Sequence, residues 1–92
     1  MNDVIATDVP RGGNAVMQLV LEPVSDVVVR VLTVQGAHVG NLKRSQGVWK
    51  FKAIGYDRHG AVLPGWGPLT DRHNTVLSSP DTALVNALLV PI

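Results

Sequence analysis

Residues 48–56, with the sequence VWKFKAIGY, decide the class of fold because apolar and polar side chains alternate along them. In an extended chain Trp49, Phe51 and Ala53 share one face. Lys50 and Lys52 share the other face. Such alternation is typical of an antiparallel strand with one buried face and one face in water. The segment therefore predicts a half-buried strand whose aromatic residues serve the core.

Three segments that precede this strand also have extended patterns. Residues 15–22 (AVMQLVLE) predict a strand with one buried face, which carries Ala15, Met17, Leu19 and Leu21. Residues 27–35 (VVVRVLTVQ) are apolar on nearly both faces, which predicts a central strand. A short strand is expected over residues 37–42, with Gly40 as a bulge or a close-packing point.

Turn signals separate these strands. The segment PVSD (23–26) predicts a turn, Gly36 predicts a second, and KRSQG (43–47) predicts a tight connection in which Gly47 has a positive φ. Further along, PGWGP (64–68) is too rich in proline and glycine for regular structure. We expect a loop there, with Trp66 either folded back over the sheet or offered to a partner.

The triplet Asp-Arg-His occurs twice, at residues 57–59 before Gly60 and at residues 71–73 before Asn74. Aspartate accepts hydrogen bonds from nearby amides, and Gly and Asn both tolerate the left-handed backbone conformation of a turn. Both copies are therefore predicted to be hairpin turns. Asp57 and Asp71 would hold the turns, and the Arg and His side chains would point to solvent.

Residues 78–90 have the pattern of a C-terminal helix. Ser79 is expected at the N-cap, Pro80 at the first helical position and Asp81 in the first turn, with Pro91 ending the helix. A broad apolar face would pack on the sheet through Leu84, Val85, Leu88 and Leu89.

These elements predict an α+β fold in which β-structure dominates: an antiparallel meander sheet of four to five strands with one C-terminal helix. A small all-β barrel with a helical cap is the alternative. Residues 1–13 are expected to form a flexible N-terminal arm, because they show no sustained period and contain Pro10 and two glycines. Residues 14–92 would then form a single compact domain.

Composition limits the function. The chain of 92 residues has no cysteine, which excludes disulfides and thiolate metal sites. No signal-peptide pattern or membrane-length apolar run is seen, so a cytoplasmic protein with no membrane partner is expected. The net charge is only +1, yet seven of the eight Lys and Arg residues lie between residues 27 and 72.

The residues with catalytic or metal-binding chemistry do not form a specific motif. His38, His59 and His73 with two aspartates have the chemistry of metal ligands, but Asp-x-His is a weak pattern. Ser78 and Ser79 fit a helix start better than a nucleophile. No catalytic residue, metal or cofactor is predicted, and a small enzyme or metal-binding protein built on the two Asp-Arg-His turns is the least favoured hypothesis.

The basic residues offer a possible binding surface. The segment 43–58 mixes cations with aromatic residues, as in proteins that bind single-stranded nucleic acid on a sheet. Lysines and aromatics on one face would favour nucleic acid, whereas opposite faces would favour a protein-interaction module. The candidate partner-binding residues are Trp66, Lys43, Arg44, Lys50, Lys52, Arg58 and Arg72.

The favoured hypothesis is a small non-catalytic protein-interaction module that self-associates as a homo-oligomer. Its two-sided apolar strand and broadly apolar helix carry more aliphatic surface than one small core covers. Nucleic-acid binding through residues 43–58 is the second hypothesis.

Overall fold

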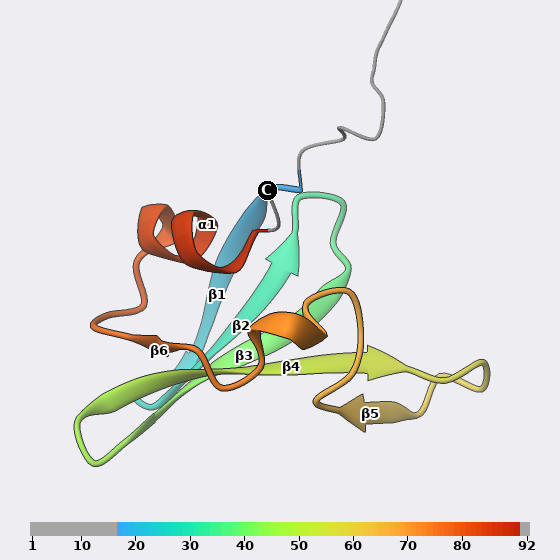
Figure 1. Ribbon diagram of the computed structural model, residues 1–92, viewed down its shortest axis with the longest axis horizontal. Helices are drawn as coiled ribbons and strands as arrows, with labels where there is room; N and C mark the ends of the chain where they lie inside the picture. Colours follow the sequence, from blue (N-terminus) through green and yellow to red (C-terminus); the bar gives the residue numbers. More distant parts are fainter. Residues whose placement is uncertain (1–16, 91–92) are drawn as a thin grey trace, which may run out of the picture.

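The computed structural model describes residues 17–90, which form an antiparallel sheet with one α-helix packed against it (Figure 1). Four strands follow one another from the start: β1 (Leu19–Ser25), β2 (Val28–Thr33), β3 (His38–Ser45) and β4 (Val48–Tyr56). Shorter elements complete the chain: β5 (Val62–Pro64), the 3-10 helix η3 (Thr70–Arg72), β6 (Val76–Leu77) and α1 (Thr82–Leu89). The predicted arm, residues 1–13, lies outside the described residues.

The strands pair in the order β1-β2-β3-β4-β5, and every neighbouring pair is antiparallel. β6 pairs with the beginning of β4, on the side where β5 pairs with its end. Within residues 17–90 β1 does not pair with β5, so the sheet is open and the barrel alternative is wrong. The predicted α+β meander with a C-terminal helix is confirmed, and β6 adds one short strand.

One face of the sheet, the inner face, carries the core. Phe51 and Ala53 are fully buried there, as the alternation in β4 predicts, and Trp49 packs against them at the rim. The core also includes Val85 and Leu89 of α1 and Leu69 of the loop before η3. The residues that alternate with these along the strands, among them Lys50 and Lys52, point to the other face, which we call the outer face.

β1 differs from the expected strand at its end. It continues through Pro23 to Ser25, so the turn contains only Asp26 and Val27. The ladder with β2 shifts between Pro23 and Ser25. Because β1 is an edge strand, the N–H that proline lacks is not needed for pairing, which is why the chain stays extended where the sequence predicts a turn.

A β-bulge lies where β2 meets β3. Val31 pairs with Gly40 but Leu32 pairs with His38, so Val39 is an extra residue in β3. A Cβ on Gly40 would lie 2.3 Å from Cε1 of Phe51, so the ring occupies the space above this glycine. The prediction for Gly40 as a bulge or a close-packing point is confirmed in both respects.

β3 is longer than expected and takes in residues 43–45. The connection to β4 is only Gln46 and Gly47, with φ of 55° and 77°. Positive φ at both central residues is the geometry of a type I′ turn, whose twist matches that of the flanking strands. The prediction for Gly47 is confirmed, whereas the five-residue connection is wrong.

The helix begins later than the sequence suggests. Asp81, and not Ser79, is the N-cap, because its carboxylate accepts a hydrogen bond from the N–H of Leu84 at 2.9 Å. α1 buries Val85 and Leu89 completely, while Leu88 is 41% exposed. The predicted packing of Leu89 is confirmed and that of Leu88 is wrong.

Candidate interaction surface

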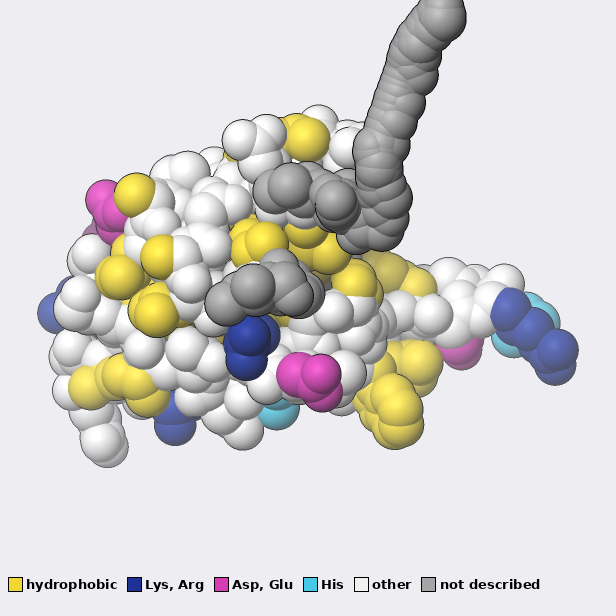
Figure 2. Space-filling model, turned by 45° about the horizontal axis from the view of Figure 1, so that its top comes forward, with side chains coloured by type: hydrophobic (Ala, Val, Ile, Leu, Met, Phe, Trp, Pro, Cys, Tyr) yellow, Lys and Arg dark blue, Asp and Glu magenta, His cyan; other side chains and the backbone are white. Residues whose placement is uncertain are grey.

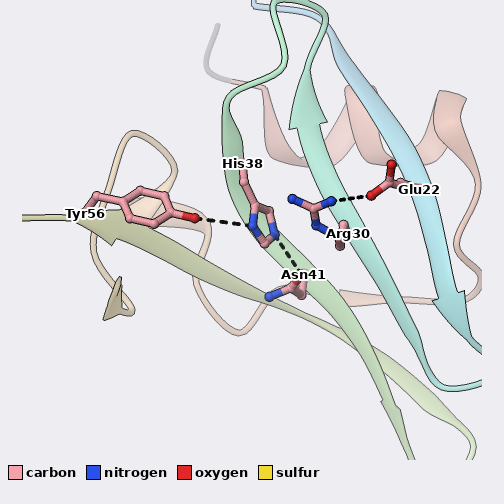
Figure 3. Close-up of polar contacts among 5 residues, drawn as sticks. All are labelled: Glu22, Arg30, His38, Asn41 and Tyr56. Atoms are coloured by element: carbon pink, nitrogen blue, oxygen red, sulfur yellow. Dashed lines mark hydrogen bonds and ion pairs between the residues drawn. The ribbon is translucent and has the colours of Figure 1, made fainter. Parts of the chain in front are cut away.

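The outer face of the sheet is the face that α1 leaves uncovered. α1 packs on the inner face, and Figure 3 shows it behind the sheet when the outer side chains face the viewer. No helix of residues 17–90 lies on the outer face. Side chains of paired residues stand side by side across the strands, so the surface is organised in cross-strand rows.

One row joins apolar side chains to a histidine and a tyrosine. Val20 pairs with Leu32, which pairs with His38. Tyr56 reaches across from β4, with its hydroxyl 3.5 Å from Nδ1 of His38, and pairs with Val62 (Figure 3). We call these five residues the His38–Tyr56 row. Val20, Tyr56 and Val62 are between 41% and 51% exposed, so the row offers a mixed apolar and aromatic surface.

The histidine in this row is oriented by a hydrogen-bonded chain. Nε2 of His38 lies 2.8 Å from Oδ1 of Asn41 and donates to it, which leaves Nδ1 to accept from the hydroxyl of Tyr56. His38 and Asn41 are three residues apart and would lie on opposite faces of a regular strand. The bulge at Val39 brings them to the same face.

The next row is polar throughout. Glu22, Arg30, Asn41 and Lys52 are paired in this order across β1, β2, β3 and β4. Nη1 of Arg30 forms an ion pair with Oε1 of Glu22 (Figure 3), and Nζ of Lys52 donates to Oδ1 of Asn74. This row separates the His38–Tyr56 row from the other end of the outer face.

At that other end two lysines stand directly opposite each other. Val28, Lys43, Lys50 and Val76 form a row across four strands, and the Cβ atoms of the paired lysines are about 5 Å apart. With Lys52 they line an open groove of ≈ 550 Å³, which we call the lysine groove; Val48 and Val76 contribute its apolar wall. Within residues 17–90 none of these three lysines forms an ion pair.

The other predicted cations lie apart from this groove. Arg44 pairs with Trp49 and therefore lies on the inner face. Arg58 is exposed in the turn between β4 and β5. Figure 2 shows basic and histidine side chains together at one projecting end of the molecule. Arg72 lies in η3, where its Nε is buried without a hydrogen-bond partner among the described residues. The six cations thus do not form one surface.

Trp66 is exposed over 66% of its surface in the loop after β5. The backbone of this loop packs tightly on β4, where Gly67 of the loop meets Gly55 of the strand. A Cβ on Gly67 would lie 2.1 Å from the carbonyl oxygen of Ile54, and a Cβ on Gly55 would lie 2.7 Å from the backbone N of Gly67. The backbone, and not the indole, therefore covers the sheet. Of the two expectations for Trp66, the exposed position is the one observed.

The first Asp-Arg-His turn is confirmed. The carboxylate of Asp57 accepts hydrogen bonds from the N–H groups of His59 and Ala61 at 2.8 and 2.9 Å. Gly60 has a φ of +84°, and its N–H donates to the carbonyl of Asp57. Arg58 and His59 are exposed, as predicted.

The second turn is wrong as a hairpin, because β5 and β6 each pair with β4 and not with each other. Asp71 lies in η3, and its carboxylate accepts no hydrogen bond from the described residues. His73 does not point to solvent, since its Nδ1 accepts a hydrogen bond from the N–H of Ala53 at 3.0 Å. Only Asn74, with a φ of 74°, behaves as predicted.

The structural counterpart of the Asp57 turn is residues 33–37 (TVQGA). Thr33 and Asp57 each donate from N–H to the carbonyl of the alanine four residues later, and each accepts the N–H of that alanine on its side-chain oxygen. Gly36, with a φ of +95°, corresponds to Gly60. The shared signal is an oxygen-bearing residue followed three and four positions later by Gly-Ala, which the repeated Asp-Arg-His obscures.

Residues 17–90 contain no group of three or more His, Cys, Asp or Glu side chains that could hold a metal ion. In this same part of the chain, no helix combines the length and the apolar character needed to cross a bilayer. Comparisons of the chain with protein-family models, with curated proteins and with solved structures found no match.

Proposed function

We propose that the protein is a small non-catalytic interaction module that self-associates through the His38–Tyr56 row. The observation that carries this proposal is the exposure of Val20, Tyr56 and Val62 along one row of an open sheet face. Tyrosine is enriched at protein interfaces because its ring combines a large apolar area with a polar end. The oriented hydroxyl of Tyr56 and the ring of His38 supply that polar component.

Hydrogen bonds at the β1 edge and beside β4 favour a contact through the face of the sheet. At the β1 edge, the side chain of Asn86 makes hydrogen bonds with both N–H and C=O of Leu19, and Pro23 has no N–H to offer. On the far side of β4, the N–H of Phe51 donates to Thr75, and the N–H of Ala53 donates to His73. At these positions a second copy could not extend the sheet through backbone hydrogen bonds.

Charge determines which end of the outer face two copies can share. A symmetric contact brings the same patch of both molecules together, so a contact centred on the lysine groove would oppose its lysines with those of the partner. The His38–Tyr56 row lies at the opposite end, about 13 Å away along the strands. It carries no Asp, Glu, Lys or Arg.

The test is the mass in solution of the full-length chain, measured by light scattering over a range of concentrations. Wild type is expected to show a concentration-dependent mass above that of one chain. Val20→Glu and Tyr56→Glu, on separate strands of the row, should each give the monomer, because a carboxylate would be buried in the contact.

Val24→Glu is the matched control, because Val24 is 60% exposed near the end of β1 and outside the row. It should leave the mass unchanged. A wild-type chain that is monomeric at the highest soluble concentration, or equal dissociation by all three variants, would contradict the proposal.

A further inference from the structure

We propose that the lysine groove binds the phosphodiester backbone of single-stranded nucleic acid. The proposal rests on the outer-face lysines and is independent of self-association through the His38–Tyr56 row. It concerns Lys43, Lys50 and Lys52, which come from two adjacent strands and line one groove.

The direct pairing of Lys43 with Lys50 is the first observation. Like charges that face each other across an antiparallel pair destabilise the sheet. Lys52 adds a third positive charge two residues further along the same face of β4, about 7 Å from Lys50. Within residues 17–90 no ion pair compensates any of the three, so an anion in the groove would relieve the repulsion.

The shape of the site is the second observation. The groove is open, so a chain can run through it, and a volume of ≈ 550 Å³ exceeds what a single phosphate fills. Proteins that bind single strands combine a cationic groove with aromatic side chains; the lysines of this groove would supply the first of these, the contacts to phosphates, which do not read the sequence.

The division of charge on the outer face supports the same site. Arg30, the one other cation that residues 17–90 place on this face, already forms an ion pair with Glu22, whereas the described lining of the groove includes no carboxylate. Trp49 and Phe51 lie on the inner face, opposite the lysines, which is the arrangement that favours a protein-interaction module, so bases would not stack on them and the proposal rests on the lysines alone. The contact we infer is therefore with the backbone and independent of base sequence.

The experiment is a fluorescence-anisotropy titration of labelled oligothymidylate and oligouridylate with the full chain. Neutralising three phosphates predicts a slope of log K against log salt of about −2 for single strands, so affinity should fall about 20-fold between 50 and 200 mM salt. Changing Lys43→Gln together with Lys50→Gln should reduce the slope to about −0.7 and weaken binding at least tenfold at the lower salt.

The matched control changes Arg44→Gln together with Arg58→Gln, which removes the same charge from the inner face and from the β4–β5 turn. It should retain the wild-type affinity within about twofold. The thermal midpoint of the lysine double variant should be equal to or above that of wild type, because the change removes a repulsion. That result separates lost binding from lost folding.

Three results would overturn the proposal: no salt-dependent binding at the lower salt, equal weakening by both double variants, or binding of polyglutamate or phosphatidylserine vesicles as tight as that of the oligonucleotides. Val20→Glu should bind oligonucleotide as wild type does. If the protein did not self-associate, nucleic-acid binding by the lysine groove could still be tested.

Discussion

The side chain of Asn86 in α1 makes two hydrogen bonds with the backbone of Leu19 in β1. The N–H of Leu19 donates to Oδ1 of Asn86 at 2.9 Å, and Nδ2 of Asn86 donates to the carbonyl of Leu19 at 3.0 Å. The amide thus takes the place of a neighbouring strand at this edge residue. The same Nδ2 donates to the carbonyl of Thr82, which fixes the amide on the helix.

Replacing Asn86→Leu should lower the free energy of unfolding by about 1–3 kcal/mol, because both backbone groups of buried Leu19 lose their partner. Urea denaturation followed by circular dichroism measures the change. Ala87→Leu, at the exposed neighbouring position, is the matched control and should stay within about 0.5 kcal/mol of wild type. If the two variants were equally stable, the amide would not hold the edge.

The two Asp-Arg-His segments should respond differently to the same change. Asp57→Ala removes the acceptor for two amides and should cost about 0.5–2 kcal/mol of unfolding free energy, whereas Asp57→Asn keeps an acceptor and should be nearly neutral. Asp71→Ala should change stability by less than about 0.5 kcal/mol. A comparable loss at both positions in thermal or urea unfolding would show that the second aspartate also holds its turn.

The two histidines of these segments give a further contrast. His73→Phe leaves the N–H of Ala53 without an acceptor and should cost about 1–3 kcal/mol of unfolding free energy. The N–H of Ala53 should also exchange faster with solvent deuterium, as measured residue by residue by NMR. His59→Phe, in the exposed turn, serves as the control and should alter neither quantity. Unchanged protection of Ala53 in the first variant would argue against the imidazole as its partner.

Two adjacent leucines of α1 test how the helix packs. Leu89→Ala should cost about 2–5 kcal/mol of unfolding free energy, because the side chain is fully buried in the core. Leu88→Ala, at 41% exposure, should cost less than about 1 kcal/mol. Denaturant unfolding of both variants shows which leucine faces the core. A larger loss of unfolding free energy for Leu88→Ala than for Leu89→Ala would mean that the helix is rotated about its axis.

Much of the fold could be predicted because its signals are local. The alternation in residues 48–56 placed Phe51 in the core and Lys50 and Lys52 outside it. Turn chemistry at Asp57 and Gly60 needs only neighbouring amides and a permitted φ, so it too could be read from the sequence. Predictions of this kind depend on interactions within a few residues.

The failures have a different cause. The second Asp-Arg-His segment does not form a hairpin because distant residues control it: Asn74 and Thr75 exchange hydrogen bonds with Phe51, and His73 bonds to Ala53. Likewise Pro23 stays in a strand because β1 is an edge, which is a property of the whole sheet. The lysine groove could be foreseen only in part, since Lys43 joins it through the cross-strand register with Lys50.

The extra residue in β3 decides on which face of the sheet the preceding part of that strand places its side chains. Val39 and Gly40 together face one residue of β2, so His38 appears on the outside although counting back from Asn41 would place it inside. Losing the extra residue would straighten the strand and leave His38 opposite Leu32 on the outer face. Losing two residues would place the histidine directly before Asn41, opposite the buried Val31, and so direct it into the core. At this point of the chain the loss of one residue should therefore be tolerated better than the loss of two.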